Sequence, residues 1–249
     1  MASFDIVGDI AIFQTDISKK EAEALLKEHN NLKVVCKKTK KYSGRYRLPK
    51  LKVIAGEKRK ETEYKENNAR LKLDVEKCYF SPRLANERLR IAKLVKENES
   101  VLVMFSGVGV YPLVIAKNSK PKIVYGIEIN PIAHKYALEN AELNKVGNVK
   151  LFKGDVKKVV PKLKKKFDRI LMPLPKGGEN FLGVALKAAK KGTIMHFYDF
   201  LNEKDFNLAK EKIGKACSKA KKKYKILKLV KCGQFGPGIY RVCADFKIM

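Results

Sequence analysis

The order of hydrophobic and polar residues divides the chain into an irregular part, up to about residue 80, and a regular part after it. In the regular part, apolar runs of strand length alternate with stretches whose apolar residues recur at helical spacing. Strands are predicted over residues 101–105, 123–127, 149–152, 167–172, 193–198, 226–230 and 239–248. Helices are predicted over residues 112–117, 131–144, 181–190 and a lysine-rich segment ending near 222. This alternation predicts an α/β fold with a mostly parallel seven-stranded sheet, helices on both faces and an antiparallel pair at one edge.

The irregular part has fewer signals. Residues 10–13 and 32–36 have the composition of short strands, and Ser18 followed by Glu21 is a capping box that opens a helix through about residue 28. Ser81-Pro82 has the form of an N-cap and a first-turn proline, which predicts a helix to about residue 98. We therefore expect a small α+β domain over residues 1–80 and a larger domain over residues 81–249.

Charge changes this picture most. Lys and Arg total 55 against 26 Asp and Glu, a formal net charge of +29 over 249 residues. Such an excess raises the local concentration of polyanions and speeds their capture. The alternative is the lysine-rich surface of a thermophile, but that bias adds Glu together with Lys, and here the acids do not keep pace. We therefore expect a nucleic acid as the partner.

Basic residues are densest between residues 37 and 60, where eleven Lys or Arg stand against one acid. Tyrosines are interleaved with them, and basic groups beside aromatic rings suit a phosphate backbone with an exposed base. The candidate RNA-binding residues are Lys40, Lys41, Arg45 and Arg47. The alternative is a solvated hairpin edge protected by lysines.

Several classes of protein are disfavoured. The five cysteines are an odd number and lie far apart with no Cys-x-x-Cys pair, which argues against a disulfide framework and a zinc site. No apolar run approaches the length of a membrane span, and the N-terminus lacks the features of a signal peptide. We expect a cytoplasmic protein that uses no metal and no membrane.

A glycine-containing turn joins the first strand of the regular part to its helix. Its sequence is Phe105-Ser-Gly-Val-Gly-Val-Tyr-Pro112, and Gly107 and Gly109 let the backbone pass close to a ligand. In a doubly wound sheet this turn lies at the carboxyl ends of the strands, where ligands bind. A dinucleotide fingerprint needs a third glycine where Pro112 stands. The turn therefore disfavours NAD and FAD and suits a cofactor without a pyrophosphate.

Acidic residues follow the next two strands. Glu128 comes 21 residues after Gly107, a spacing at which a carboxylate can accept bonds from both hydroxyls of a ribose. The alternative is a surface Glu at a strand end. Asp155 and Val156 follow the third strand, where the carboxylate commonly faces the amino group of an adenine and the next backbone amide a ring nitrogen. The Gly-Asp pair is also common in simple turns.

The fourth strand leads into a loop where catalytic residues of this architecture lie. The loop begins Met172-Pro-Leu-Pro-Lys176 and continues to Glu179. Its prolines rigidify it, and its charged side chains are candidates for proton transfer. The candidate catalytic residues are Pro173, Lys176 and Glu179. The alternative is a plain connector between strand and helix.

Together these segments resemble the archaeal and eukaryotic family of the tRNA guanine-37 N1-methyltransferase, which also contains the wybutosine-synthesising TYW2/Taw2 branch. The resemblance spans nearly the whole chain. It rests on Gly8-Asp-Ile10, residues 79–88 (YFSPRLANER), the loops 105–112 and 172–176, Gly126-Ile-Glu-Ile-Asn-Pro131 and Glu139-Asn-Ala-Glu-Leu-Asn144. Residues 79–88 are its most specific part. It implies a class I methyltransferase-like Rossmann domain, a small N-terminal RNA-binding domain and S-adenosylmethionine as the group donor.

The resemblance also implies roles for individual residues. Ser81 and Arg88 would contact the methionine end of the cofactor, with Arg88 pairing with its carboxylate. Glu128 would hold the ribose, and Asp155 with Val156 the adenine. The expected cofactor-binding residues are Ser81, Arg88, Phe105, Gly107, Gly109, Glu128, Ile129, Asp155 and Val156.

Two departures favour the TYW2/Taw2 branch. The N1-methyltransferases have a sequence similar to Met-Asn-Leu-Pro in the fourth-strand loop. This chain has Pro173 in place of the Asn. They also carry an extra N-terminal domain, for which we expect no room here. The resemblance then implies that a monomer transfers the 3-amino-3-carboxypropyl group to 4-demethylwyosine at position 37 of tRNA-Phe and releases 5′-methylthioadenosine.

Three other functions are weighed against this one. Guanine-37 N1-methylation on the same fold is disfavoured by the missing Asn. A non-catalytic RNA-binding protein with a vestigial cofactor fold is disfavoured by the intact glycines and acids. An NAD-dependent enzyme is disfavoured by Pro112 and by the charge. In-line attack selects the sulfonium carbon that faces the acceptor, so we expect Ser81, Arg88 and residues 173–176 to decide which group is transferred.

Overall fold

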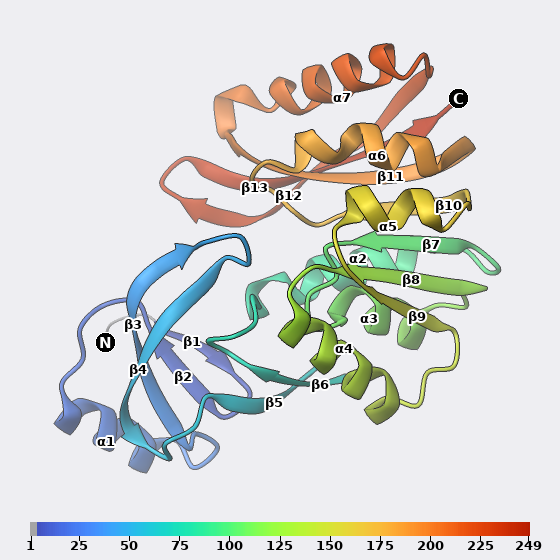
Figure 1. Cartoon of the computed structure of the whole chain (residues 1–249). Coiled ribbons are helices and arrows are strands. Elements are labelled where there is room, and N and C mark those ends of the chain that lie inside the picture. Colours follow the sequence, from blue (N-terminus) through green and yellow to red (C-terminus); the bar gives the residue numbers. More distant parts are fainter. Residues whose placement is uncertain (1–3) are drawn as a thin grey trace.

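The computed structural model describes residues 4–249 and contains a large sheet with a smaller N-terminal unit beside it (Figure 1). The large sheet has the strand order β12-β13-β11-β10-β7-β8-β9. Its strands are β7 (Ser100–Met104), β8 (Ile123–Glu128), β9 (Val149–Lys153), β10 (Phe167–Met172), β11 (Ala189–Asn202), β12 (Tyr224–Gly236) and β13 (Ile239–Ile248). Strand β13 pairs antiparallel with β11 and β12, and the other pairs are parallel. The predicted seven-stranded α/β sheet is therefore confirmed.

Helices cover both faces of this sheet (Figure 1). One face carries α2 (Ala85–Leu94), α3 (Val110–Asn118) and α4 (Pro131–Leu143), and the other carries α5 (Val156–Lys162), α6 (Leu182–Ala188) and α7 (Asn207–Lys219). Along β7, Val101 and Val103 pack into the first core, and Leu102 and Met104 pack into the second. Successive side chains of a strand point to opposite faces, so a strand buried on both faces is a continuous apolar run.

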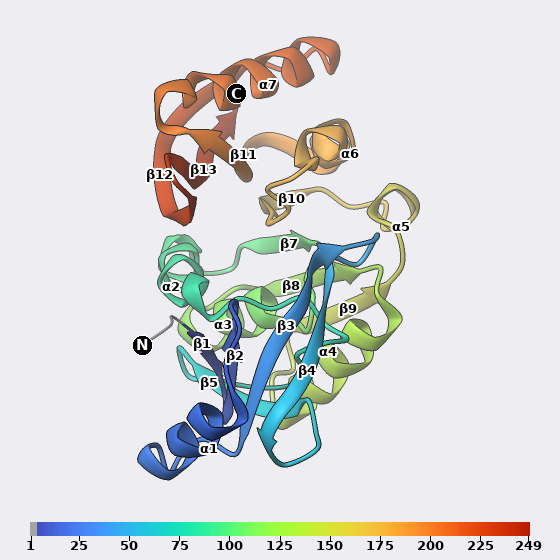
Figure 2. The ribbon, with the colours of Figure 1, turned by 90° about the vertical axis from the view of Figure 1, so that its left-hand side faces the viewer.

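The N-terminal unit is a four-stranded sheet with one helix, which agrees with the predicted α+β class. Its strands are β1 (Phe4–Val7), β2 (Ile10–Phe13), β3 (Val34–Ser43) and β4 (Leu48–Gly56), in that spatial order. Helix α1 (Lys19–Glu28) begins at the predicted capping box, in which Ser18 and Glu21 bond each other's backbone N–H. The β3–β4 hairpin rises from this unit toward the large sheet (Figure 2).

A second hairpin, β5 (Glu61–Glu66) and β6 (Ala69–Asp74), connects the two parts. The amide group of Asn140 bonds the backbone N–H and C=O of Lys72 at 2.7 and 3.0 Å, and Asn144 does the same for Arg70 at 2.8 and 2.6 Å. One side chain of α4 and that of its C-cap residue, Asn144, thus stand in for a neighbouring strand. One apolar core continues from the N-terminal sheet through this hairpin to the helices of the large domain.

Some predicted elements differ from the structure. After Ser81 the chain forms a 3-10 turn, η1 (Pro82–Leu84), and then α2, which ends at Leu94 rather than near residue 98. Ser81 occupies the N-cap position, but its side chain makes no capping bond. The other short turns are η2 (Gly178–Phe181) and η3 (Glu203–Asp205). Within residues 4–249, no helix is both long and apolar enough to cross a membrane.

Candidate functional site

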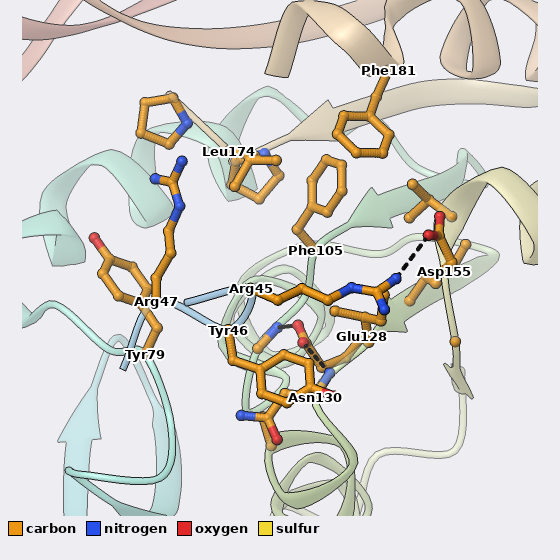
Figure 3. A pocket seen from close by; sticks show the side chains of 18 residues that line it. Arg45, Tyr46, Arg47, Tyr79, Phe105, Glu128, Asn130, Asp155, Leu174 and Phe181 are labelled. Atoms are coloured by element: carbon orange, nitrogen blue, oxygen red, sulfur yellow. Dashed lines mark hydrogen bonds and ion pairs between the residues drawn. The ribbon is translucent and has the colours of Figure 1, made fainter. Parts of the chain in front are cut away.

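A cavity of about 190 Å³ lies at the carboxyl ends of β7, β8, β9 and β10, and we call it the strand-end pocket. Ligands of doubly wound sheets bind at this edge. The loop after each of the four strands contributes to the wall, and the β3–β4 hairpin covers it (Figure 3). The predicted cofactor-binding residues that line it are Phe105, Gly107, Glu128, Ile129, Asp155 and Val156, together with the predicted catalytic residue Pro173.

Glu128 is held by the backbone on both sides. Its Oε2 accepts from the N–H of Gly107 and its Oε1 from the N–H of Asn130, each at 2.7 Å. Burial raises the pKa of this carboxyl above its usual value, and the backbone N–H groups oppose that shift. A carboxylate has about four acceptor sites. Each oxygen therefore keeps a lone pair for a hydroxyl group in the pocket.

The two glycines of the first loop have different roles. Gly107 has a φ of +57°, and a Cβ there would meet nothing closer than the Tyr79 carbonyl oxygen at 3.8 Å, so its open side faces the pocket. Gly109 has a φ of +84° and begins α3, and a Cβ there would lie 3.2 Å from the Cβ of Ala137 on α4. Gly109 does not line the pocket. Its glycine allows α3 and α4 to approach closely.

Asp155 ends the third loop and caps α5. Its Oδ1 accepts from the N–H of Lys157 at 2.8 Å, and its Oδ2 pairs with the guanidinium of Arg45 at 3.1 Å (Figure 3). The Arg45 side chain is 65% exposed. Such an exposed pair contributes about 0–1 kcal/mol, so Oδ2 can readily exchange Arg45 for another donor, such as an adenine amino group.

The tip of the β3–β4 hairpin reaches across to the fourth-strand loop. Arg45, Tyr46 and Arg47 line the strand-end pocket, and Arg47 donates to the carbonyl oxygen of Lys176 at 2.5 Å. Burial lowers the pKa of Arg47 below its usual value. The predicted basic segment is therefore both a hairpin edge and part of the pocket. Lys40 is exposed on β3, away from the pocket, and the side chain of Lys41 lies outside the described residues.

A larger cavity of about 830 Å³ adjoins the pocket, and Arg47 and Tyr79 line both. We call it the basic cleft, because the charged residues that line it in the described part of the chain are Lys38, Arg47, Arg83, Lys176 and Arg241 against the single acid Asp5. Asp5 is paired with Arg83 at 2.7 Å. Ser81 and Lys176, predicted for the cofactor and for catalysis, lie in this cleft rather than in the strand-end pocket. The cleft thus presents excess positive charge beside the pocket.

Arg88 does not reach either cavity. It is buried, its Nε donates to Oε1 of Glu66 at 2.5 Å, and its Nη2 donates to the other oxygen of Glu66 and to the Ser81 carbonyl. A buried guanidinium needs a counter-charge, and Glu66 supplies one from β5. Arg88 therefore joins β5 to α2, and it is not among the residues that line the pocket, where the resemblance implied a partner for the cofactor carboxylate.

Glu179 is also placed elsewhere. It lies on η2 and lines a groove between α6 and α7, on neither the strand-end pocket nor the basic cleft. Of the three predicted catalytic residues, the structure brings together Pro173 in the pocket and Lys176 in the adjoining cleft. The pocket also has walls that were not predicted, formed by Tyr46, Tyr79, Asn130, Leu174 and Phe181.

A buried polar cluster behind the site contains three residues with metal-binding side chains, His196, Cys243 and Asp245. His196 Nδ1 lies 2.6 Å from Asp245, and Nε2 lies 2.7 Å from Nη1 of Arg169. Because a guanidinium only donates, Nε2 accepts and Nδ1 carries the proton. Burial lowers the pKa of His196. Both ring nitrogens are engaged, so the cluster is a structural network that joins β10, β11 and β13.

Two descriptions of known protein families match separate parts of the chain. Residues 62–227 match the TRM5/TYW2 methyltransferase domain, and residues 1–59 match the TYW2 N-terminal domain. The chain is 40% identical over 252 residues to the tRNA (guanine(37)-N(1))-methyltransferase Trm5b of Pyrococcus abyssi, covering 99% of this chain and 74% of that protein. It is 38% identical to the tRNA (guanine(37)-N(1))/4-demethylwyosine(37)-methyltransferase Taw22 of Nanoarchaeum equitans, covering 96% and 97%.

A third relative has a different named reaction. The tRNA(Phe) (4-demethylwyosine(37)-C(7)) aminocarboxypropyltransferase of Methanocaldococcus jannaschii is 33% identical, covering 97% of this chain and 96% of that protein. Among solved structures, Pyrococcus abyssi Trm5b superposes with a TM-score of 0.90 over 99% of this chain and 74% of that one, at 40% identity. Methanocaldococcus jannaschii TYW2 in complex with AdoMet superposes with a TM-score of 0.76, at 28% identity, over 99% and 100%.

Proposed function

Because the chain belongs to the TRM5/TYW2 methyltransferase family, we propose that it transfers a group from S-adenosylmethionine to the nucleotide at position 37 of a tRNA. The names of the three compared relatives all specify position 37. The net charge of +29 and the basic cleft beside the pocket suit a tRNA as substrate. Such a substrate fits a cytoplasmic enzyme, and because one chain supplies the whole pocket we expect a monomer.

The strand-end pocket has the groups that the adenosyl moiety needs. Glu128 keeps acceptor capacity on both carboxylate oxygens for the ribose hydroxyls, and Gly107 leaves space where a side chain would intrude. Asp155 Oδ2 suits the adenine amino group, and the Val156 N–H a ring nitrogen. Bound S-adenosylmethionine supplies a sulfonium with three carbons open to in-line attack. The residues of this chain act by fixing which carbon faces the acceptor.

For the reaction itself, we propose transfer of the 3-amino-3-carboxypropyl group to 4-demethylwyosine of tRNA-Phe. The main support for this reaction is the apolar pocket wall formed by Pro173, Leu174 and Pro175, which offers no amide side chain to a guanine. The new bond joins the acceptor carbon to the methionine Cγ while the Cγ–sulfur bond breaks. The acceptor loses a proton, and 5′-methylthioadenosine leaves.

The methionine end would then extend from the pocket toward the basic cleft. Arg47 lines both cavities, so we assign it, in place of Arg88, as the partner of the methionine carboxylate. Ser81, on the cleft wall, is the proposed hydroxyl contact at the same end. Lys176 stands beside them, and its carbonyl fixes Arg47. Positioning by these groups supplies the rate.

Methyl transfer to the same nucleotide is the second candidate. It is favoured by the higher identity to relatives named as methyltransferases, 40% and 38%, than to the aminocarboxypropyltransferase, 33%. The two candidates differ in the sulfonium carbon that faces the cleft and, where the acceptor is guanine N1 as in the name of the Pyrococcus abyssi relative, in the base that receives the group.

Labelled cofactor separates the two. The protein is incubated with tRNA-Phe that bears 4-demethylwyosine and with S-adenosylmethionine labelled either in the methyl or in the carboxyl group. We expect carboxyl label in the tRNA. Methyl label alone would replace the proposed reaction with the second candidate, and so would methyl label in a tRNA-Phe that still bears guanine at position 37. Label in neither tRNA, with tRNA still bound, would contradict an enzymatic role.

A further inference from the structure

An aromatic pair, of which one ring is exposed, lines the basic cleft. Phe235, near the end of β12, is 65% exposed, and its ring centroid lies 4.1 Å from that of Phe200 on β11. Burial of a Phe side chain stabilises a fold by about 1.5–3 kcal/mol. Because Phe235 is mostly exposed, it contributes little of this stabilisation. Single exposed apolar residues are common, so the exposure of Phe235 indicates a function only if its neighbours do as well.

The surroundings of Phe235 are those of a nucleic-acid contact. Arg241, cross-strand from Phe200, has its Cζ 5.2 Å from the Phe200 ring centroid, and its Nε is buried without a hydrogen-bond partner among the described residues. All three side chains line the basic cleft together with Lys176. The pairing of β12 with β13 is irregular around residues 234–236, and such irregularities change the direction in which side chains point. An aromatic face beside arginine and excess positive charge suits an unpaired base on a phosphate backbone.

We propose that Phe235, supported by Phe200 and Arg241, stacks an unpaired base of the tRNA anticodon loop next to the modified nucleotide. The proposal rests on the tRNA substrate proposed above and is independent of which carbon is transferred. The cleft places the stacked base beside the fourth-strand loop, because Lys176 of that loop lines the same cavity. Phenylalanine has no hydrogen-bonding group, so the contact tolerates any base and holds the loop open without reading its sequence.

The chain contains no tryptophan, which allows a direct test. Phe235→Trp introduces a single tryptophan and keeps the aromatic face. Leu227→Trp is the matched control, because Leu227 is 48% exposed on the same strand, roughly 25 Å away at strand spacing. We expect tRNA-Phe transcript to quench Phe235→Trp and to leave Leu227→Trp unchanged. An RNA hairpin with the same loop but an abasic residue beside position 37 should quench less.

Binding measurements complete the test. Phe235→Ala should bind tRNA-Phe about tenfold more weakly, with S-adenosylmethionine affinity unchanged, and Phe235→Tyr should restore tRNA binding. Full tRNA affinity in Phe235→Ala would overturn the proposal, as would tRNA binding to Phe235→Trp without quenching or equal quenching of both tryptophans. If the wild-type protein binds no tRNA, the proposed function fails first, so the two failures are distinguishable.

Discussion

The strand-end pocket takes its fixed groups from loops that each follow one strand of the same sheet, whereas the basic cleft is assembled from segments far apart in the chain. In the pocket, Glu128 is fixed by backbone N–H groups of its own loop and the adjacent one. In the cleft, the cations come from β3, the segment before α2, the fourth-strand loop and β13. The difference predicts that changes to the fixed groups of the pocket affect the cofactor, and that changes on the cleft wall, apart from Arg47 and Ser81 at the methionine end, affect the RNA.

The largest expected effect is on the stability of the fold, and it comes from the buried Arg88–Glu66 ion pair, which lines neither cavity. Arg88→Ala leaves Glu66 buried without its partner, so the free energy of unfolding should fall by about 3–5 kcal/mol, measured by urea denaturation. The double variant Arg88→Met/Glu66→Leu should recover much of this loss, because an apolar pair needs no counter-charge. If Arg88→Ala kept its stability but lost affinity for S-adenosylmethionine, the result would instead support Arg88 as a cofactor-binding residue.

Next in size is the loss of the ribose acceptor. Glu128→Ala should weaken S-adenosylmethionine about 100-fold, because two hydrogen bonds to a charged group are lost, while tRNA affinity stays unchanged. Titration calorimetry and filter binding measure the two. Glu142→Ala, at an exposed position on α4, is the control and should change neither. Equal loss of both affinities in Glu128→Ala would remove the distinction between pocket and cleft.

The pH dependence of cofactor binding sharpens the same point. Burial raises the pKa of the free Glu128 carboxyl above its usual value near 4.5. Ribose hydroxyls donate to the ionised form, so the affinity should fall as pH drops through the raised pKa, by at most about tenfold per pH unit. Glu128→Ala should lack this dependence. An affinity for S-adenosylmethionine that stays constant on acidification would count against the ribose role.

The smallest expected effect comes from the Arg45–Asp155 ion pair, which joins the β3–β4 hairpin to the strand-end pocket. Arg45→Ala frees Asp155 from an exposed ion pair worth about 0–1 kcal/mol, so cofactor affinity should stay constant or rise by up to about fivefold. The same change should lower the slope of log tRNA affinity against log salt by about one. A marked loss of cofactor affinity would make Arg45 part of the cofactor site rather than a bridge to the RNA.

The sequence predicted the pocket better than the cleft, for a physical reason. A glycine turn and an acid at a strand end are fixed by local spacing, so Gly107, Glu128 and Asp155 lie where they were expected. The pairing of Arg88 with Glu66 was not predicted, because Glu66 lies 22 residues earlier and no local pattern joins them.

The β5–β6 hairpin was missed for another reason. Strand β6 alternates buried Leu71 and Leu73 with exposed Arg70 and Lys72, and follows Asn67-Asn68, both of which have positive φ. That two-residue turn with period-two alternation is a hairpin signal. No such signal reveals that Phe235 and Phe200 meet, since β12 and β11 are brought together only by the strand order of the sheet.

The by-product of the reaction tests the central claim most directly. The wild-type protein is incubated with S-adenosylmethionine and tRNA-Phe that bears 4-demethylwyosine, and the released nucleoside is identified by chromatography. Transfer of the 3-amino-3-carboxypropyl group predicts 5′-methylthioadenosine in amounts equal to the modified tRNA. Release of S-adenosylhomocysteine instead would contradict the account, because the methyl carbon would then be the one that faces the cleft.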